Sequence, residues 1–304
     1  MDNLFFTIFT PTYNRQALLH RAYESICRQN TQNFEWVIVD DGSTDDTRAL
    51  IESWQKTATF SIIYYYQQNS GRHVAINRGI ELANGEFFII LDSDDWLTDR
   101  SLELTAAAWK SLPDSKKENC SGIWGLCAYV DGAIAGSKFP SDIFVSNTIE
   151  INTIYNVSGD KCHAIRTEIR KKFMFPESDE KYCMPSLVWN RIGQHYTTLF
   201  INDVLQFIEY QVGGLSKAGK TKLWKYPQNY RLRSKEYVAI KNRVILPKDR
   251  KDAMKMYIRA SFHAKVGLFR QFLEISDKVL WCKSLRKGRR KYLKDLEMTR
   301  VETL

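Results

Sequence analysis

The sequence predicts an α/β fold in which a mostly parallel sheet is flanked by helices and followed by a basic helical extension. Through Asp99, apolar runs rich in β-formers alternate with stretches whose apolar residues recur at helical spacing. This alternation is typical of parallel sheets built from strand–helix units. Ligands bind such sheets beyond the carboxyl ends of the strands. Three of the predicted strands end there in polar clusters: Thr10–Arg15, Asp40–Ser43 and Asp92–Asp95.

Four strands and three helices are predicted in this first part. The strands are the runs "LFFTIFTPTY", "FEWVIVD", "FSIIYYYQQ" and "EFFIILDSDD". The helices are "NRQALLHRAYESICRQ", "DDTRALIESWQ" and "GRHVAINRGIELAN". We expect Asn14 to cap the first helix and Gly85 to end the third, because these residue types are favoured at those positions.

Beyond Asp99 the pattern is less regular. We expect a helix in "SLELTAAAWKSL", a polar loop over residues 113–121, a strand and hairpin from "GIWGLCAYV" through the next Asp-Gly, and a helix around Leu187–Ile192 among short strands. After "GGLSK" the chain becomes basic and helical in pattern. The predicted division is therefore residues 1–100, 101–216 and 217–304, with the first two parts as halves of one domain.

Charge is distributed unevenly along the 304 residues. From Ser216 to the end there are 25 Lys and Arg and 8 Asp and Glu, a net charge of +17, whereas the preceding residues carry a net charge of −8. A basic segment of this kind attracts a polyanion, either an anionic membrane surface or nucleic acid. No recognised nucleic-acid-binding module accompanies the charge, which favours the membrane.

The stretch "VGLFRQFLEISDKVLWCKSLRKGRRKYLKDL" combines cations with apolar residues in the manner of a helix that lies on an anionic membrane. The alternative is a basic helix that packs on the rest of the protein and keeps its cations in water. The apolar positions that decide between these two interpretations are residues 266, 268, 269, 272, 273, 279, 280 and 281.

Several classes of protein are disfavoured by composition. The six cysteines are scattered without CxxC spacing, so neither a zinc site nor a disulfide framework is indicated. No apolar run approaches the ~20 residues of a membrane-spanning helix. The start "MDNLFFTIFTPTYNR" lacks the pattern of a signal peptide. We expect a cytoplasmic protein, with peripheral association at the inner face of the cell membrane as the role of the basic segment.

Asp92 and Asp94 stand two positions apart directly after a buried strand. Carboxylates on such a turn can converge on one hard cation and leave coordination positions open for substrate phosphates, as is usual for Mg²⁺ or Mn²⁺. The alternative is a solvated turn that caps the following helix, because acidic residues are common in turns. Asp95 fits this structural interpretation.

The motifs together resemble family 2 glycosyltransferases of the GT-A fold. The matching segments are "FTPTYNR" at 9–15, "VIVDDGSTDDT" at 37–47, "GRHVAINRGIELANGEFFIILDSDDWL" at 71–97 and "FPESDEKYCMPSLVWNRI" at 175–192, in the family's order and spacing. Among its members, the chain is similar to bacterial enzymes of polysaccharide synthesis. The resemblance implies that residues 1–100 bind a nucleotide-sugar and that residues 101–216 bind the acceptor.

The resemblance also implies roles for individual residues at the donor site. Asp94 would bind Mn²⁺ or Mg²⁺, and Asp92 would contact the metal or the ribose. Asp40 would accept a hydrogen bond from the base, which is typically uracil, while Asp41 would hold the loop. The remaining expected substrate contacts are Thr10, Pro11, Tyr13, Arg15, Arg72 and Asn77, with Trp189 at the acceptor.

The implied reaction is an inverting transfer, most simply from a UDP-sugar to a hydroxyl of a saccharide or lipid-diphosphate-linked saccharide. It requires a base for the acceptor hydroxyl. Within "PESDEKYCMPSLVWN" we rank Glu180 first, Asp179 second and Glu177 third. Many family members have an adjacent Glu-Asp pair here, and others have an acid just before the helix, where this chain has Met184-Pro185.

Other interpretations stay open at this stage. Tyr13 and Trp189 can serve as packing residues, and His73 can be a satisfied interior histidine. "GGLSK" at 213–217 is either a lid over the diphosphate or a linker. A nucleotidyltransferase also combines such a fold with metal carboxylates, but it usually opens with a Gly-rich loop that "TPTYNR" lacks. A catalytically silent protein that binds membranes or partners is disfavoured by the intact Asp92 and Asp94.

Overall fold

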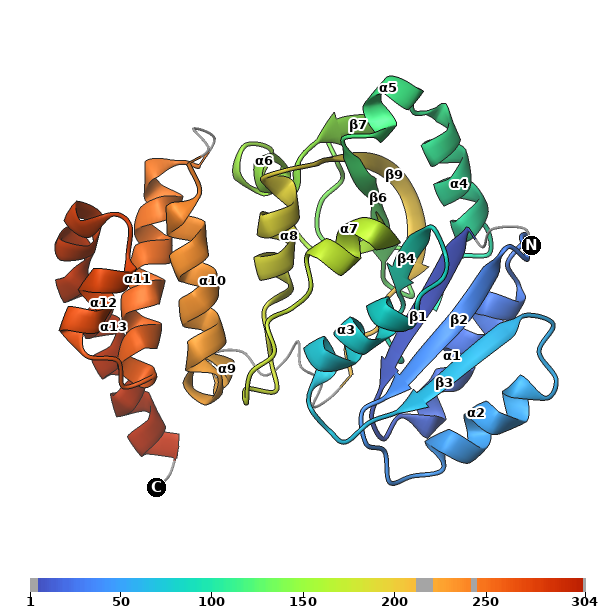
Figure 1. The fold of residues 1–304 in the computed structure, drawn as a ribbon, viewed down its shortest axis with the longest axis horizontal. Helices are drawn as coiled ribbons and strands as arrows, with labels where there is room; N and C mark the ends of the chain where they lie inside the picture. The colour runs from blue at the N-terminus through green and yellow to red at the C-terminus, as the bar shows by residue number, and fades with distance from the viewer. Residues whose placement is uncertain (1–4, 212–220, 242–244, 303–304) are drawn as a thin grey trace.

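A computed structural model describes residues 5–211, 221–241 and 245–302 of the chain. Its centre is one twisted sheet, and a separate group of helices lies beside it at the C-terminal end of the chain (Figure 1). The predicted α/β fold with a helical extension is confirmed. The segment 213–217, interpreted above as a lid or a linker, lies outside the described residues.

The sheet is parallel in its first half and mixed in its second. Strands β1 to β4 pair in the order β3-β2-β1-β4, all parallel, and β4 then pairs antiparallel with β8. The order continues through β6, β9 and β5, with β7 on β9. The strands are β1 Phe6–Thr12, β2 Phe34–Asp40, β3 Ser61–Tyr66, β4 Phe87–Ile90, β5 Trp96–Leu97, β6 Cys120–Ala128, β7 Ile143–Ser146, β8 Lys161–Arg166 and β9 Thr197–Phe207.

Helices cover both faces of this sheet, so its central strands are apolar on both sides. On one face, Ile8 and Trp36 pack with α1 (Gln16–Cys27), α2 (Thr47–Gln55) and α4 (Ser101–Ser111). On the other face, Phe9 and Val37 pack with α3 (Arg72–Leu82), α7 (Thr167–Lys172) and α8 (Pro185–Gly193). Neighbouring residues of one strand thus enter different cores, because side chains alternate across a sheet. One sheet thus takes its strands from both of the predicted halves, between Phe6 and Phe207.

Three local expectations are corrected. Arg15, not Asn14, occupies the N-cap of α1; Asn14 has a positive φ of 50°, and its side-chain oxygen accepts from the backbone N–H of Thr44 at 2.8 Å. Helix α3 ends at Ala83, which has an extended conformation, so Gly85 does not end this helix. A glycine is needed at position 85 because the backbone of β1 passes close to it. A Cβ on Gly85 would lie 2.4 Å from the backbone of β1. The expected loop 113–121 contains the short helix α5 (Asp114–Lys117) and the start of β6.

The C-terminal helices form a core of their own. They are α9 (Thr221–Lys225), α10 (Pro227–Ala239), α11 (Pro247–His263), α12 (Leu268–Glu274) and α13 (Lys278–Glu302). Met254, Tyr257 and Trp281 are buried among them. Helix α10 contacts α8, where Arg191 and Glu236 form an ion pair with N–O distances of 2.7 and 2.8 Å. In the described part of the chain, no helix carries an apolar stretch that is long enough to cross a membrane.

Candidate active site

A cavity of about 760 Å³ opens at the carboxyl ends of β1 and β4 and extends toward α8. Its walls come from the polar loops after β1, β2 and β4, from the start of α3, and from β6, β8, β9 and α8. The predicted residues that line this cavity are Pro11, Tyr13, Arg15, Arg72, Asp92, Asp94 and Trp189. Residues from three separate motifs therefore meet in one cavity, as the sequence indicated.

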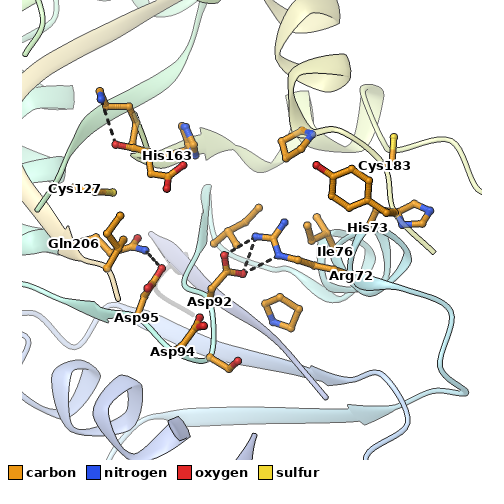
Figure 2. Close-up of a pocket in the computed structure, with 18 of the residues that line it drawn as sticks. Arg72, His73, Ile76, Asp92, Asp94, Asp95, Cys127, His163, Cys183 and Gln206 are labelled. Atoms are coloured by element: carbon orange, nitrogen blue, oxygen red, sulfur yellow. Dashed lines mark hydrogen bonds and ion pairs between the residues drawn. The ribbon is translucent and has the colours of Figure 1, made fainter. Parts of the chain in front are cut away.

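The acidic turn after β4 forms part of the wall of the cavity (Figure 2). Arg72 on α3 donates from Nε and Nη2 to Asp92, with N–O distances of 2.7 to 2.9 Å. Burial raises the pKa of Asp94, and the neighbouring Asp92 raises it further. These pKa shifts arise because burial and like charge both disfavour an ionised carboxylate. The turn is thus short of positive charge in spite of Arg72.

Asp95 belongs to the same turn but has a different environment. It is buried, and it accepts hydrogen bonds from Gln206 Nε2 at 2.9 Å and from the backbone N–H of Glu209 at 3.3 Å. Burial, followed by the charges of Asp92 and Asp94, raises the pKa of Asp95 to about 8. These contacts join the turn to strand β9 and the residues after it. The structural role that the sequence suggested for Asp95 agrees with them.

The donor atoms of the turn are suited to a divalent cation. Asp92 and Asp94 offer carboxylate oxygens, which Mg²⁺ and Mn²⁺ prefer. Burial, followed by the charge of Asp92, raises the pKa of Asp94, so a cation there would stabilise its ionised form. No cluster of three or more His, Cys, Asp or Glu side chains able to hold a metal occurs among the described residues. A cation here would therefore depend on these two carboxylates and on oxygens from a substrate or water.

Asp41 holds the loop between β3 and α3, as expected. Its carboxylate accepts from Gln67 Nε2 and from the backbone N–H groups of Ser70 and Gly71, all at 2.8 Å. Gly71 has a φ of +100°, and a Cβ there would lie 2.4 Å from the carbonyl oxygen of Lys181. Only glycine suits both the conformation and the close approach. The loop is thereby held against the segment that precedes α8.

Three expected substrate contacts do not line the cavity. Thr10 is a buried residue of β1, and its Oγ1 accepts from Trp36 Nε1 on β2 at 3.0 Å. Asp40 accepts from the backbone of Ser43 at 2.7 Å and from Tyr64 Oη at 2.8 Å. Both carboxylate oxygens of Asp40 are therefore engaged in holding the loop after β2.

Asn77 is the third of these residues. It exchanges hydrogen bonds with the backbone of Phe175, both at 2.9 Å, and donates to Glu177 Oε1 at 3.1 Å. It is buried on α3 and joins that helix to the segment before α8. Its contacts are those of a structural tie, because its amide is already paired within the protein.

The three candidate bases also lie outside the lining of the cavity. Both oxygens of Glu180 accept backbone N–H groups at the start of α10, from Gln228 and Asn229, each at 2.7 Å. Burial raises the pKa of Glu180, although these two hydrogen bonds oppose the shift. Asp179 is exposed, and Glu177 accepts from Asn77.

Sequence reasoning missed several residues that line the cavity: Thr12, Asn69, Trp124, Lys161, His163, Lys181, Tyr182, Gln206 and Glu209. Thr12, Lys181 and Tyr182 lie within recognised motifs, whereas the others come from elements far apart in the chain. For His73, the alternative of a satisfied interior histidine holds only in part: the residue is buried and lines the cavity, but neither ring nitrogen has a hydrogen-bond partner among the described residues.

Comparisons with known proteins agree with this architecture. The model of the family "Glycosyl transferase family 2" matches residues 7–116. GalNAc(5)-diNAcBac-PP-undecaprenol beta-1,3-glucosyltransferase of Campylobacter jejuni is 34% identical over 123 residues, which are 40% of this chain and 37% of that protein. The chain thus matches well under half the length of this curated relative.

Two solved structures share the fold. Residues 1–349 of Staphylococcus aureus TarS in complex with UDP-GlcNAc superimpose with a TM-score of 0.63 at 20% identity, covering 93% of this chain and 80% of that one. The mannosyltransferase PcManGT of Pyrobaculum calidifontis, in complex with GDP-Man and Mn²⁺, has a TM-score of 0.53 at 17% identity, covering 95% and 87%.

Proposed function

Because residues 7–116 match the model of glycosyl transferase family 2, we propose that this chain is a metal-dependent inverting glycosyltransferase of cell-surface polysaccharide synthesis. It moves a sugar from a UDP-sugar to a hydroxyl of a saccharide or lipid-linked saccharide. The observation that carries the proposal is the acidic turn after β4. There, Asp92 and Asp94 face one cavity together with the cation of Arg72 and the exposed ring of Tyr13.

The donor nucleotide occupies the part of the cavity lined by Pro11, Tyr13 and Arg15. Tyr13 is 49% exposed, so its ring is free to pack on a base. Arg15 and Arg72 supply positive charge for a diphosphate, since guanidinium groups bind phosphate oxygens through charge-assisted hydrogen bonds. The UDP-GlcNAc complex of TarS, which has the same fold, supports a UDP-sugar as the donor.

Asp94 and Asp92 would hold Mn²⁺ or Mg²⁺ together with the diphosphate. The bound cation would supply neutralising charge for the leaving nucleoside diphosphate. Arg72 orients Asp92 through its bidentate contact and adds a second positive charge beside the leaving group. The Mn²⁺ complex of PcManGT supports the choice of metal.

The acceptor hydroxyl loses its proton to a carboxylate of the segment before α8. The contacts of Glu180 are those of a helix cap, because both of its oxygens accept from the start of α10. Asp179 is exposed, and no hydrogen bond to its carboxylate is found among the described residues. We therefore propose Asp179 as the base, ahead of Glu180, and assign Glu180 to positioning α10 against the segment.

The acceptor is a saccharide or a lipid-diphosphate-linked saccharide, and the C-terminal helices bring the enzyme to an anionic membrane. Four apolar side chains of α12 and the first turn of α13 are exposed: Phe269 by 76%, Val279 by 64%, Leu273 by 59% and Leu268 by 45%. We call these four residues the apolar edge. By contrast, Phe272, Leu280 and Trp281 pack into the helical core. The stretch therefore packs on the protein through these three residues and offers the apolar edge to a membrane.

Cations accompany the apolar edge. The solvent-facing side of α13 carries Lys283, Arg286, Lys287, Arg289, Arg290, Lys291 and Lys294, with Glu297 as an exposed acid. Apolar side chains beside a cationic helix suit a lipid surface, where the chains insert and the cations meet headgroups. The undecaprenol-linked substrate in the name of the Campylobacter relative supports a membrane-bound acceptor.

Calorimetry with UDP and Mn²⁺ tests the donor site. We expect UDP to bind far more tightly with Mn²⁺ than without it, and Asp94→Asn to abolish this difference. Asp99→Asn is the matched control, because Asp99 pairs with Arg28 at the surface, outside the cavity. Equal binding of UDP–Mn²⁺ by the Asp94 variant and the wild type would contradict the metal assignment. A screen of UDP-sugars by hydrolysis would then identify the donor.

A further inference from the structure

A group of aromatic side chains lines the cavity away from the motifs that identify the donor site. Trp124 on β6 and His163 on β8 are directly opposite each other in the antiparallel pair, with ring centroids 4.2 Å apart. Trp189 on α8 completes the group, at 5.3 Å from Trp124 and 4.7 Å from His163. All three rings line the cavity, and Figure 2 shows His163 above the acidic turn. Neither Trp124 nor His163 is among the residues proposed to bind the donor.

This group offers hydrogen bonds that the described residues do not use. Trp124 is 5% exposed, and its Nε1–H has no acceptor in the described structure. A buried indole N–H normally has a partner, and because Trp124 lines the cavity, its Nε1–H is available to a ligand oxygen. Burial, followed by the charges of Arg170, Lys161 and Arg72, lowers the pKa of His163 to about 3. The imidazole is therefore neutral and has one nitrogen that accepts.

A donor and an acceptor beside aromatic faces suit a sugar. A hydroxyl group both donates and accepts hydrogen bonds, so it matches Trp124 Nε1 and the free imidazole nitrogen. The apolar C–H face of a sugar ring packs on aromatic rings, as ligands generally do in apolar pockets with a few polar groups. The group thus has the chemistry of a saccharide subsite.

Positive charge lies behind this group without a matching carboxylate. Arg170 on α7 is 1% exposed, and its guanidinium lies 5.2 Å from the ring centre of Trp189 and 5.6 Å from that of Phe175. Among the described residues it forms no ion pair; Nη1 donates to the carbonyl of Phe173 at 3.4 Å, and Nε and Nη2 have no acceptor. Burial, and then Arg72, lowers the pKa of Arg170 to about 9.

Lys161 adds a second buried cation in the lining of the cavity. Its Nζ donates to backbone carbonyls, the shortest contact being 2.6 Å to Ser158. The carboxylate of the preceding Asp160 is engaged by Tyr210 Oη at 2.6 Å. Buried charges without a partner are costly, so a negative group in this part of the cavity would be attracted.

We propose that Trp124, His163 and Trp189 form a subsite for a sugar that bears a carboxylate, with Arg170 and Lys161 providing the positive field that selects it. This inference rests on the proposed function in that the substrates are saccharides. The acidic sugar is either the transferred unit of the donor or the residue of the acceptor. The chemistry is the same in both cases, and two binding experiments distinguish them.

The first experiment measures binding of methyl β-glucuronide and methyl β-glucoside to the protein saturated with UDP and Mn²⁺. The second compares UDP-glucuronic acid with UDP-glucose on the protein with Mn²⁺ alone. A preference of about tenfold or more for the acid is expected in one arm, given two nearby cations in a poorly screened cavity. Preference in the first arm assigns the acidic sugar to the acceptor, and in the second arm to the donor. No preference in either arm overturns the proposal.

Nitrogen NMR of the histidine rings on the wild-type protein locates the binding. Addition of the preferred acidic sugar should shift the ring signals of His163 and leave those of His263, in the C-terminal helices, unchanged. Unchanged signals of His163 at saturation overturn the proposal. Failure of UDP to bind would count against the proposed function, whereas the methyl glycosides and His163 would still report on the subsite.

Two variants test the individual contributions. Trp124→Phe keeps an aromatic ring and removes Nε1, and should weaken the binding of both sugars about fivefold. Trp109→Phe, at a buried tryptophan outside the cavity, is its control.

Arg170→Gln should remove the preference for the acidic sugar and leave the affinity for the neutral sugar unchanged, while Arg170→Lys should retain the preference. Lys171→Gln, on the same helix, should change neither. A preference that survives Arg170→Gln in a folded protein would contradict the role of Arg170; if this variant does not fold, the wild-type arms and the NMR signals decide.

Discussion

Arg72 binds Asp92 through two of its nitrogen atoms: Nε lies 2.9 Å from Oδ1, and Nη2 lies 2.7 Å from Oδ1 and 2.8 Å from Oδ2. Both side chains are about one-third exposed to the cavity. The guanidinium of Arg72 is thus already bound to Asp92, one of the two carboxylates proposed to hold a metal. The ion pair fixes the orientation of the Asp92 carboxylate.

We expect Arg72→Gln to separate the two roles of this guanidinium. Free Mn²⁺ should bind more tightly, because Asp92 loses a competing cation, whereas UDP–Mn²⁺ should bind about tenfold more weakly, because the diphosphate loses a cation. Calorimetry with Mn²⁺ alone and with UDP measures both effects. Arg78→Gln on the same helix, where Arg78 pairs with Glu81 at the surface, is the control. A uniform loss of both affinities would mean that Arg72 only supports the fold.

Asp179→Asn should lower kcat by ~10²–10⁴-fold with little effect on stability, since a general base contributes about this much and Asp179 is exposed. Glu180→Gln should mainly lower the melting temperature, because a neutral amide is a poorer acceptor for the two N–H groups at the start of α10. Turnover and thermal unfolding of both variants are compared. Loss of kcat in Glu180→Gln alone would restore Glu180 as the base.

Gly71→Ala should disturb the contact between the loop before α3 and the segment before α8. The added methyl group meets the backbone of Lys181 at 2.4 Å, and the residue is held at a φ of +100°. Such a strained conformation costs ~1–3 kcal/mol in a non-glycine residue. Thermal unfolding and UDP affinity should both fall. Gly132→Ala, at a positive φ with open space around it, is the control that isolates the steric part.

The double variant Phe269→Ser, Val279→Ser should release the protein from anionic liposomes. Each large apolar side chain contributes ~1.5–3 kcal/mol when it is buried, so partitioning should drop more than tenfold. Ile143→Ser removes a side chain that is 63% exposed on the sheet domain and should have no effect. Co-sedimentation with anionic and neutral vesicles measures the change. Equal partitioning of wild type and double variant would rule out insertion of the apolar edge.

The C-terminal helices should lose stability at acid pH through Asp295 on α13. Its carboxylate accepts from Arg259 and from His263 Nε2 on α11. Burial alone would raise the pKa of Asp295, but these hydrogen bonds lower it below its ordinary value of 3.8. The contribution of Asp295 is therefore complete above about pH 4 and disappears as the pH falls through the lowered pKa.

Asp295→Asn tests this pH dependence. The variant should unfold with a free energy lower by ~3 kcal/mol at pH 7, because it leaves Arg259, whose side chain is only 14% exposed, without its ion pair. The difference from the wild type should shrink on going from pH 5 to pH 3. Denaturant unfolding at several pH values measures it, and a difference that is constant with pH would exclude the carboxylate as the cause.

Much of the fold and the family could be predicted from local patterns. Strands β1 to β4 are continuous apolar runs, and the motifs around Asp41, Arg72 and Asp92 are short and contiguous. The resemblance to family 2 is confirmed. The sequence also predicted that Tyr13, Arg72 and Asp94 lie near one another, because the carboxyl ends of parallel strands share one edge of the sheet. In the structure these three residues line one cavity.

Hydrogen-bond partners could not be predicted in this way. Thr10, Asp40 and Asn77 belong to recognised motifs, yet each is engaged by residues such as Trp36, Tyr64 and Phe175, which only the packed structure brings near. Motif membership alone does not say whether a polar side chain faces a ligand or its own backbone.

The sequence by itself determined the class of fold, the acidic turn after β4 and the basic character of the C-terminal helices, because each depends on residues close together in the chain. Only the tertiary structure brought Trp124, His163 and Trp189 into one group, turned Glu180 into the cap of α10, and divided the apolar residues of α12 and α13 between core and surface. These outcomes depend on contacts between residues far apart in sequence, and local periodicity carries no information about them.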